Sequence, residues 1–338
     1  IARTGIDAAG KTRIMKLPRA IDPFLLALVC AVGLAMILPV HGTGLNIVNF
    51  AVTILIALLF FFQGVRLPRS AVVAALAHWR LHGTIFATTF ALFPLIGIAL
   101  HVAVPSLLAP ALWTGILFLC ALPSTVQSSV AFTSMAGGNV AAAVAAAAGS
   151  NIIGIGLTPA LLAGLLSAQG VSGAIDMTSI GRLIALMLAP FALGQMLGKW
   201  LGAFAVRHKA LLTLNDRGAI LLAVYAAFST ATVERIWQRI PPTQLLILLL
   251  LCCAVLAFVM LLTWHAGKLL GFTRPDRIAL LMCGSKKSLA SGVPMASVLL
   301  GSATNGLVLL PLMVYHQIQL IVCALIAQRL AAFRSPDR

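Results

Sequence analysis

The chain alternates long apolar runs with short polar or basic connections. The runs are 18 to 28 residues long, and a helix needs about 20 apolar residues to cross a membrane. They are continuous rather than alternating at every second residue, so they predict helices and not the strands of a β-barrel. The predicted spans are 23–40, 45–66, 80–102, 110–134, 139–166, 179–204, 216–233, 243–268, 276–299 and 304–329.

The polar segments complete this organisation. Residues 1–22 are predicted to be a cytoplasmic N-terminal segment and residues 330–338 a cytoplasmic tail, and the segment Ser70–His78 is expected to form a short interfacial helix. Ten spans divide into two sets of five, at 23–166 and 179–329. Because five is odd, the second set must run with inverted topology, as in inverted-repeat transporters. The sequence therefore predicts an all-α membrane protein with ten transmembrane helices in two inverted five-helix repeats.

Composition and charge support this interpretation. The 338 residues are 61% hydrophobic and only 9% charged, whereas soluble domains carry about 25% charged residues. Of the 23 Lys and Arg residues, 18 fall in connections on one side, and three, Arg182, Arg235 and Arg239, fall on the other. This asymmetry predicts a multi-pass plasma (bacterial inner) membrane protein with both termini cytoplasmic. We therefore expect the protein, despite its net charge of +16, to contact membrane lipid and not nucleic acid.

The motifs of enzymes and metal sites are missing from the sequence. The six cysteines lie in apolar runs without disulfide or metal spacing, as small hydrophobic residues do. No P-loop, dinucleotide fingerprint or nucleophile elbow occurs. We therefore expect neither an enzyme nor a cofactor, and leave sodium and protons open as coupling ions.

Polar residues interrupt the fourth span. Pro123 removes a backbone donor and disturbs the preceding turn. Polar side chains follow it at membrane depth, including Ser124, Gln127, Ser128 and Ser129. Opened helices expose carbonyls and hydroxyls that can bind ions or substrate, so these residues are predicted to line a site. The alternative is that the hydroxyls bond to their own backbone and hold helices together.

Two neighbouring spans carry further polar residues. Ser150 and Asn151 lie within the alanine- and glycine-rich fifth span, and Asn305 begins the tenth. Asn151 could cross-link helices or face the cavity, and both interpretations stay open.

The most unusual stretch is in the ninth span, where Lys286 and Lys287 lie between Ser285 and Ser288. A charge at bilayer depth costs several kcal/mol or more, so it marks a functional site. Adjacent residues on a helix point about 100° apart, so both lysines cannot face one cavity unless the segment is unwound. A lysine here could hold an anionic group or exchange protons. Alternatively, both could lie at the cytoplasmic interface.

No carboxylate lies within a predicted span. The seven acidic residues all fall in connections, tails or span ends. A sodium site or proton relay built on carboxylates therefore has no evident residue to use.

Three motifs resemble the bile acid:sodium symporter superfamily. They are LPSTVQSSVAFTSMAGGN (Leu122–Asn139), GSNIIGIGLTPALL (Gly149–Leu162) and CGSKKSLASGVP (Cys283–Pro294). They are most similar to the SBF-like branch, which holds bacterial symporters and the eukaryotic member-seven-type solute carriers of family ten. The resemblance extends from Asp22 onward. It implies a panel domain of helices 1, 2, 6 and 7 and a core domain of helices 3–5 and 8–10, in which broken helices 4 and 9 cross.

The resemblance also implies alternating-access transport of an organic anion, coupled to sodium in the well-studied branch. One family sodium site uses a Ser-Asn pair, which Ser128 and Ser129 can match. Its two hydroxyls in the fifth span fall on Ala143 and Ala147, which lack side-chain oxygens.

The family glutamate of the ninth span falls near Ser285 or Lys286. The other ligands of the second family site look like Leu289 and Thr89. A fixed lysine charge could replace a bound cation electrostatically, so we expect no two-sodium mechanism.

The leading hypothesis is a secondary active transporter of a small organic anion that works by alternating access. The alternative is a regulatory membrane protein that affects calcium or ion homeostasis without robust transport of its own. The sequence leaves the substrate, the coupling ion and the oligomeric state open.

Overall fold

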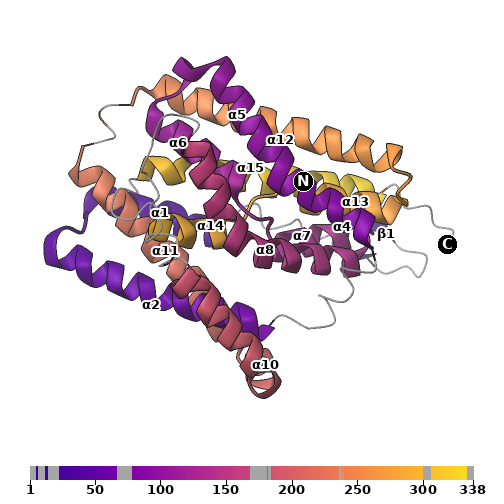
Figure 1. The fold of residues 1–338 in the computed structure, drawn as a ribbon, viewed down its shortest axis with the longest axis horizontal. Coiled ribbons are helices and arrows are strands. Elements are labelled where there is room, and N and C mark those ends of the chain that lie inside the picture. Colours follow the sequence, from indigo (N-terminus) through magenta and orange to yellow (C-terminus); the bar gives the residue numbers. More distant parts are fainter. Residues whose placement is uncertain are drawn as a thin grey trace.

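The protein is almost entirely helical. The computed structural model describes residues 5–6, 12–13, 23–66, 78–167, 181, 184–235, 238, 240–299 and 306–332 (Figure 1). Within these residues, β structure is limited to a two-residue antiparallel pair, β1 (Gly5–Ile6) with β2 (Thr12–Arg13). The predicted all-α class is therefore confirmed.

Most of the apolar runs form uninterrupted helices. These are α1 (Pro23–Ile37), α2 (Gly42–Arg66), α8 (Val140–Ser167), α10 (Ala189–Arg207), α11 (Lys209–Val233), α12 (Pro242–Leu269) and α15 (Gly306–Ala332). A continuous helix comprises α4 (Trp79–Ala87), the π-helical turn η1 (Thr88–Leu92) and α5 (Phe93–Ala103). A 3₁₀ turn, η2 (Pro105–Leu107), follows α5, and a π-helical turn, η3 (Ile184–Leu188), precedes α10. Among the described residues, six helices are long and apolar enough to cross a membrane.

Two apolar runs are each divided into two short helices. The first run forms α6 (Pro110–Ala121) and α7 (Gln127–Met135), and the second forms α13 (Arg274–Gly284) and α14 (Leu289–Leu299). Pro123 lies in the first interruption, and the two lysines lie in the second. Both interruptions coincide with the breaks that the polar residues predict.

Where the structure describes both ends, the predicted spans agree with the helices to within a few residues, except at the start of α11; the predicted start of the sixth span, at residue 179, lies outside the described residues. α11 begins at Lys209, seven residues before the predicted start at residue 216. The polar residues near Asp216 resemble a connection, but Asp216 is partly buried and forms an ion pair with Arg66 of α2 (Nη2 to Oδ2, 2.8 Å). The predicted interfacial helix, apart from His78, and most of both tails lie outside the described residues.

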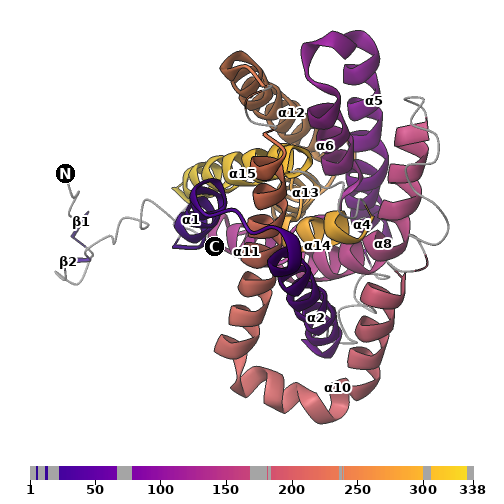
Figure 2. The same cartoon turned by 90° about the vertical axis from the view of Figure 1, so that its left-hand side faces the viewer.

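Helices α1, α2, α10 and α11 form one packed group. α2 lies against α10 and α11, and α1 lies against α11 (Figures 1 and 2). In both views α2 and α10 lie on the side of the molecule opposite α5 and α12, with α13 to α15 between them.

The remaining helices form a second group around the two interrupted helices. α13 packs against α4, α7, α8 and α12, and α15 packs against α6, α7 and α12. α11 contacts α14 and α15 and so joins the two groups.

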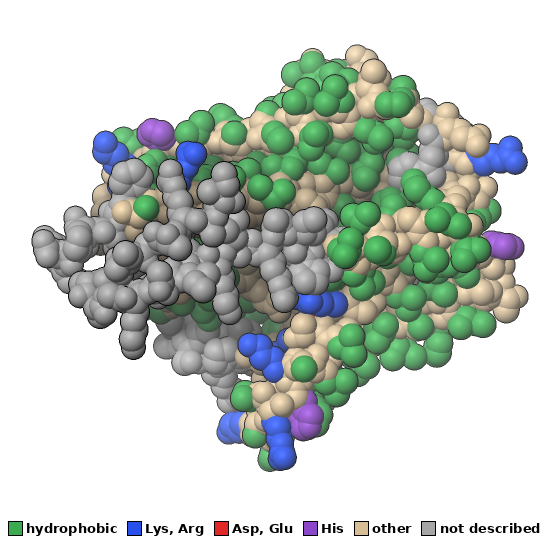
Figure 3. All heavy atoms as spheres, turned by 180° about the vertical axis from the view of Figure 1, so that it is seen from behind, with side chains coloured by type: hydrophobic (Ala, Val, Ile, Leu, Met, Phe, Trp, Pro, Cys, Tyr) green, Lys and Arg blue, Asp and Glu red, His purple; other side chains and the backbone are tan. Residues whose placement is uncertain are grey.

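The outer surface is strongly apolar. Hydrophobic side chains cover much of the face in Figure 3, and the Lys and Arg residues visible there lie mainly toward its margins. On α12, Leu246, Leu250, Phe258 and Leu261 are all more than half exposed. This is the surface expected of helices that face lipid tails.

α2 and α10 pack closely against each other through glycines. A Cβ atom added at Gly194 would overlap the backbone oxygen of Phe61, and one added at Gly64 would overlap that of Phe191. Small residues at such crossings allow two backbones to approach closely and pack well within a membrane.

We therefore expect Gly194→Ala to destabilise the protein by about 1–3 kcal/mol, because the added methyl group must push the helices apart. Thermal unfolding in detergent measures this effect. Gly202→Ala is the matched control on the same helix, since no atom lies within 4 Å of its added Cβ. Equal unfolding temperatures for the two variants would contradict the close packing.

Candidate functional site

The end of α6 leaves a row of carbonyl groups without helical partners, and each receives a donor from elsewhere. The carbonyl oxygen of Ala121 accepts from Thr158 Oγ1 (2.9 Å), and that of Pro123 accepts from the backbone N–H of Ser288 (2.9 Å). The carbonyl of Ser124 accepts from Asn151 Nδ2 (3.1 Å). Buried helix ends are stable only when such groups are paired.

The end of α13 is completed in the same way. Ser129 Oγ donates to the carbonyl of Met282 (2.9 Å), and Ser124 Oγ donates to that of Cys283. Tyr315 OH donates to the carbonyl of Ser285 (2.8 Å). Because Ser124 bonds to the second break and Ser288 bonds to the first, the two interruptions complete each other's backbone hydrogen bonds.

α8 supports this crossing with two side chains. Ser150 Oγ accepts from the N–H of Ser124 (3.0 Å), and Asn151 Oδ1 accepts from Ser291 Oγ (2.6 Å). Asn151 therefore bridges the first break and α14. This geometry favours the cross-linking interpretation of Asn151.

Lys287 occupies the centre of the crossing and is fully buried, at 0% exposure. Its Nζ donates to three backbone carbonyls, those of Thr89 (2.8 Å), Cys120 (2.9 Å) and Leu122 (2.7 Å). The ring centroid of Phe93 lies 4.1 Å from Nζ, within the range of a cation–π contact. Since an ammonium has three donors, each has an acceptor here.

Local sequence explains why these carbonyls are free. In the π-helical turn the N–H of Phe93 donates to the carbonyl of Thr88. The equivalent donor for Thr89 would come from Pro94, which has no N–H. The usual partner of the Cys120 carbonyl is the N–H of Ser124, which donates to Ser150 instead. A proline and a serine thus leave free carbonyls that a cation can bind.

Gln319 of α15 holds the backbone of Lys287. Its Oε1 accepts from the N–H of Lys287 and its Nε2 donates to the carbonyl of Lys287, both at 2.8 Å. Sequence reasoning did not identify Gln319, Tyr315, Ser291 or Thr158. Their signal was a polar side chain within a largely apolar helix.

Lys286 is also 0% exposed, but its surroundings differ. Among the described residues, its Nζ has no hydrogen-bond partner. The ring centroid of Phe132 lies 4.2 Å from it. Because both lysines are buried within protein, neither reaches an interface in this conformation.

The structure brings most of the predicted site residues to this crossing. They are Thr89, Pro123, Ser124, Ser129, Ser150, Asn151, Ser285, Lys286, Lys287 and Ser288. Gln127 is exposed at the start of α7, and Asn305 lies outside the described residues.

The predicted sodium residues, Ser128 and Ser129, both take part in hydrogen bonds. Ser128 Oγ donates to Thr125 Oγ1 (2.8 Å), and Ser129 Oγ donates to the carbonyl of Met282. Within the described residues, no three His, Cys, Asp or Glu side chains form a group that could hold a metal ion.

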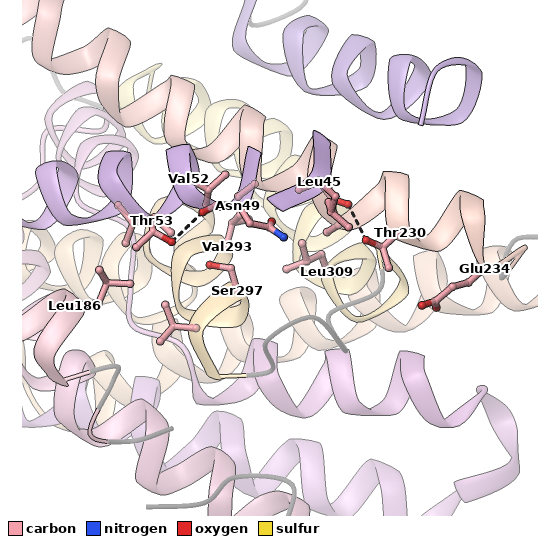
Figure 4. Close-up of a pocket in the computed structure, with 15 residues that line it drawn as sticks. Leu45, Asn49, Val52, Thr53, Leu186, Thr230, Glu234, Val293, Ser297 and Leu309 are labelled. Atoms are coloured by element: carbon pink, nitrogen blue, oxygen red, sulfur yellow. Dashed lines mark hydrogen bonds between the residues drawn. The ribbon is translucent and has the colours of Figure 1, made fainter. Parts of the chain in front are cut away.

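A cavity of about 470 Å³ lies between the two helix groups (Figure 4). Its walls come from α2, η3, α11, α14 and α15 and are largely apolar. Asn49 and Thr53 of α2 face Ser297 of α14, while Glu234 lies apart from them at the end of α11 (Figure 4). None of the predicted site residues lines this cavity. Isolated polar residues in separate spans carried no pattern that would have predicted it.

The comparisons with known proteins give a family that matches most of the chain. The chain matches the profile of the SBF-like CPA transporter family over residues 22–332, which confirms the resemblance inferred from the three motifs. It is 48% identical to "Uncharacterized protein PA2026" of Pseudomonas aeruginosa over 322 residues, which are 95% of this chain and 96% of that protein.

Two further relatives have names that state a function. The chain is 42% identical to "Putative symporter YfeH" of Escherichia coli over 315 residues, 93% of this chain and 94% of the relative. It is 28% identical to "Sodium/bile acid cotransporter 7" of Rattus norvegicus over 306 residues, 88% of this chain and 89% of the relative.

The two lysines should differ in their contribution to stability. Lys287→Met leaves three buried carbonyls without their donor, at about 1–3 kcal/mol each, so we expect a loss above about 3 kcal/mol. Lys286→Met is the matched control and should cost far less, because it breaks no hydrogen bond. Chemical unfolding in detergent measures both, and equal losses would contradict the different roles.

Proposed function

Because the chain belongs to the SBF-like CPA transporter family, we propose that it is a secondary transporter of a small organic anion that works by alternating access. The observation that carries this proposal is the crossing of two interrupted helices beside a cavity. Paired broken helices in corresponding positions mark the binding region of inverted-repeat transporters.

We propose that the helices form ten crossings in two inverted five-helix repeats. The support is the order of elements. α6 and α7 occupy the fourth place of the first repeat, and α13 and α14 occupy the fourth place of the second. The packing of α1, α2, α10 and α11 with one another supports a panel, and the helices around α13 and α15 support a core.

The cavity between these groups is the proposed substrate site. Its apolar walls suit the body of an amphipathic solute, and Asn49, Thr53 and Ser297 can hydrogen-bond a polar group. An anionic group would bind at this end, away from the carboxylate of Glu234 (Figure 4). The relative named as a sodium/bile acid cotransporter supports an organic anion as the first class to test.

Neither lysine lines the cavity, so we do not assign either one to direct contact with substrate in this conformation. We propose instead that Lys287 takes the place of a bound cation. Backbone carbonyls of broken helices are the ligands that coordinate sodium in other transporters, and here three of them bind the ammonium. The proposed location is the bacterial inner membrane, with both termini cytoplasmic.

Uptake into proteoliposomes tests this function. A panel of organic anions that includes bile acids is first screened by thermal shift, and anions that bind are then measured for uptake. We expect saturable uptake that Asn49→Leu and Ser297→Val weaken, because both changes remove polar groups that face the cavity. Saturable uptake that neither substitution affects would contradict the site.

Uptake should not require sodium. We expect equal initial rates in sodium and in choline media, because the ammonium of Lys287 already binds the carbonyls of Thr89, Cys120 and Leu122. The same proteoliposomes measure this. Strict sodium dependence with a Hill coefficient of about two would contradict the proposal that Lys287 replaces a bound sodium ion.

A further inference from the structure

The two adjacent lysine side chains have different surroundings. The Nζ of Lys287 has three carbonyl acceptors at 2.7–2.9 Å and contacts the ring of Phe93. Lys286 has a ring but no hydrogen-bond partner among the described residues. A buried ammonium without acceptors is very unfavourable, whereas a neutral amine is tolerated far better. The three carbonyls therefore favour the ammonium form of Lys287, whereas burial without an acceptor favours the neutral amine form of Lys286.

The groups around Lys286 do not supply a counter-charge. The titratable side chains that interact with it are the thiols of Cys283 on α13 and Cys323 on α15. Tyr315 and His316 of α15 bond instead to the backbone of Ser285 and Lys287. α7 contributes Phe132, and the neighbouring charge on Lys287 is of the same sign. No described Asp or Glu pairs with Lys286.

Phe132 of α7 is the aromatic neighbour of Lys286. Its ring centroid lies 4.2 Å from Nζ, and its side chain is only partly buried. Lys286 also lies within the break between α13 and α14, where a change in helix packing would act on it directly.

We propose that Lys286 is the proton-binding group of the transport cycle. Its amine takes a proton from water on one side of the membrane when Phe132 moves aside, and becomes an ammonium. In the opposite-facing conformation the ammonium gives this proton to water on the other side, before the ring covers the neutral amine again. The inference rests on the proposed transport function, for which it supplies the coupling ion.

Nitrogen NMR tests the proton site without a substrate. The chain has seven lysines, so ¹⁵N-lysine labelling in lipid gives a small set of Nζ signals, and their shifts distinguish an amine from an ammonium. We expect one signal to change from ammonium to amine between about pH 6 and pH 9. The other lysine signals should remain those of ammonium groups over this range, because the usual lysine pKa is about 10.4. The titrating signal should disappear in Lys286→Met or, should that variant not fold, in Lys286→Gln.

A cavity reporter tests whether the proton changes conformation. Ser297→Cys is introduced after the exposed Cys30 and Cys253 are changed to Ser, and maleimide labelling is timed at pH 6 and pH 9. Each rate is divided by that of a cysteine peptide at the same pH, because maleimide reacts with the thiolate. We expect these normalised rates to differ by about tenfold or more, given that the protonated fraction of an amine changes by about tenfold per pH unit above its pKa. Lys286→Met should remove the difference, and Lys286→Arg, which stays charged, should keep the normalised pH 6 rate at both pH values.

Each part has a result that would overturn the inference. An Nζ signal of Lys286 that stays ammonium throughout would show that the nitrogen is not a neutral amine. A normalised labelling rate that still depends on pH in Lys286→Met would assign the proton to another group. Failure of the proposed transport function is recognised separately. In that case Lys286 titrates and controls the labelling rate as expected, but the protein carries none of the screened anions.

Discussion

The ammonium of Lys287, bound by three backbone carbonyls, is the interaction on which the centre of the molecule depends. Two helices are interrupted here, and their carbonyls lie where neither water nor a helical N–H reaches them. Lys287 links the first break to the π-helical turn, because its acceptors belong to Thr89, Cys120 and Leu122. The charge and the broken backbone are each costly alone, and each removes the cost of the other.

Reciprocal hydrogen bonds extend this interaction into a single unit. Ser124 bonds to the backbone of the second break, Ser288 bonds to that of the first, and Asn151 and Gln319 fix the crossing from α8 and α15. A network in which almost every polar group is paired is rigid. In the proposed cycle, the helices around it move as one body against α1, α2, α10 and α11, with the cavity between them.

The helices and their breaks were predictable because lipid demands long apolar runs, and Pro123 and the buried lysines are visible exceptions. The different environments of the two lysines were not predictable. They depend on Pro94, far away in the chain, and on Gln319, one of three glutamines in α15. The cavity also escaped prediction, because Asn49 and Ser297 meet only through tertiary packing.

The most direct measurement is a sodium titration of thermal stability in the parent protein and in Lys287→Ala, with choline as the control. The parent should show no sodium-specific shift in unfolding temperature, because the ammonium of Lys287 already occupies its three carbonyls. Lys287→Ala should be less stable in choline and should regain several degrees as sodium binds the vacated carbonyls. A sodium-specific shift in the parent, or none in Lys287→Ala, would contradict the claim that this lysine replaces a bound cation.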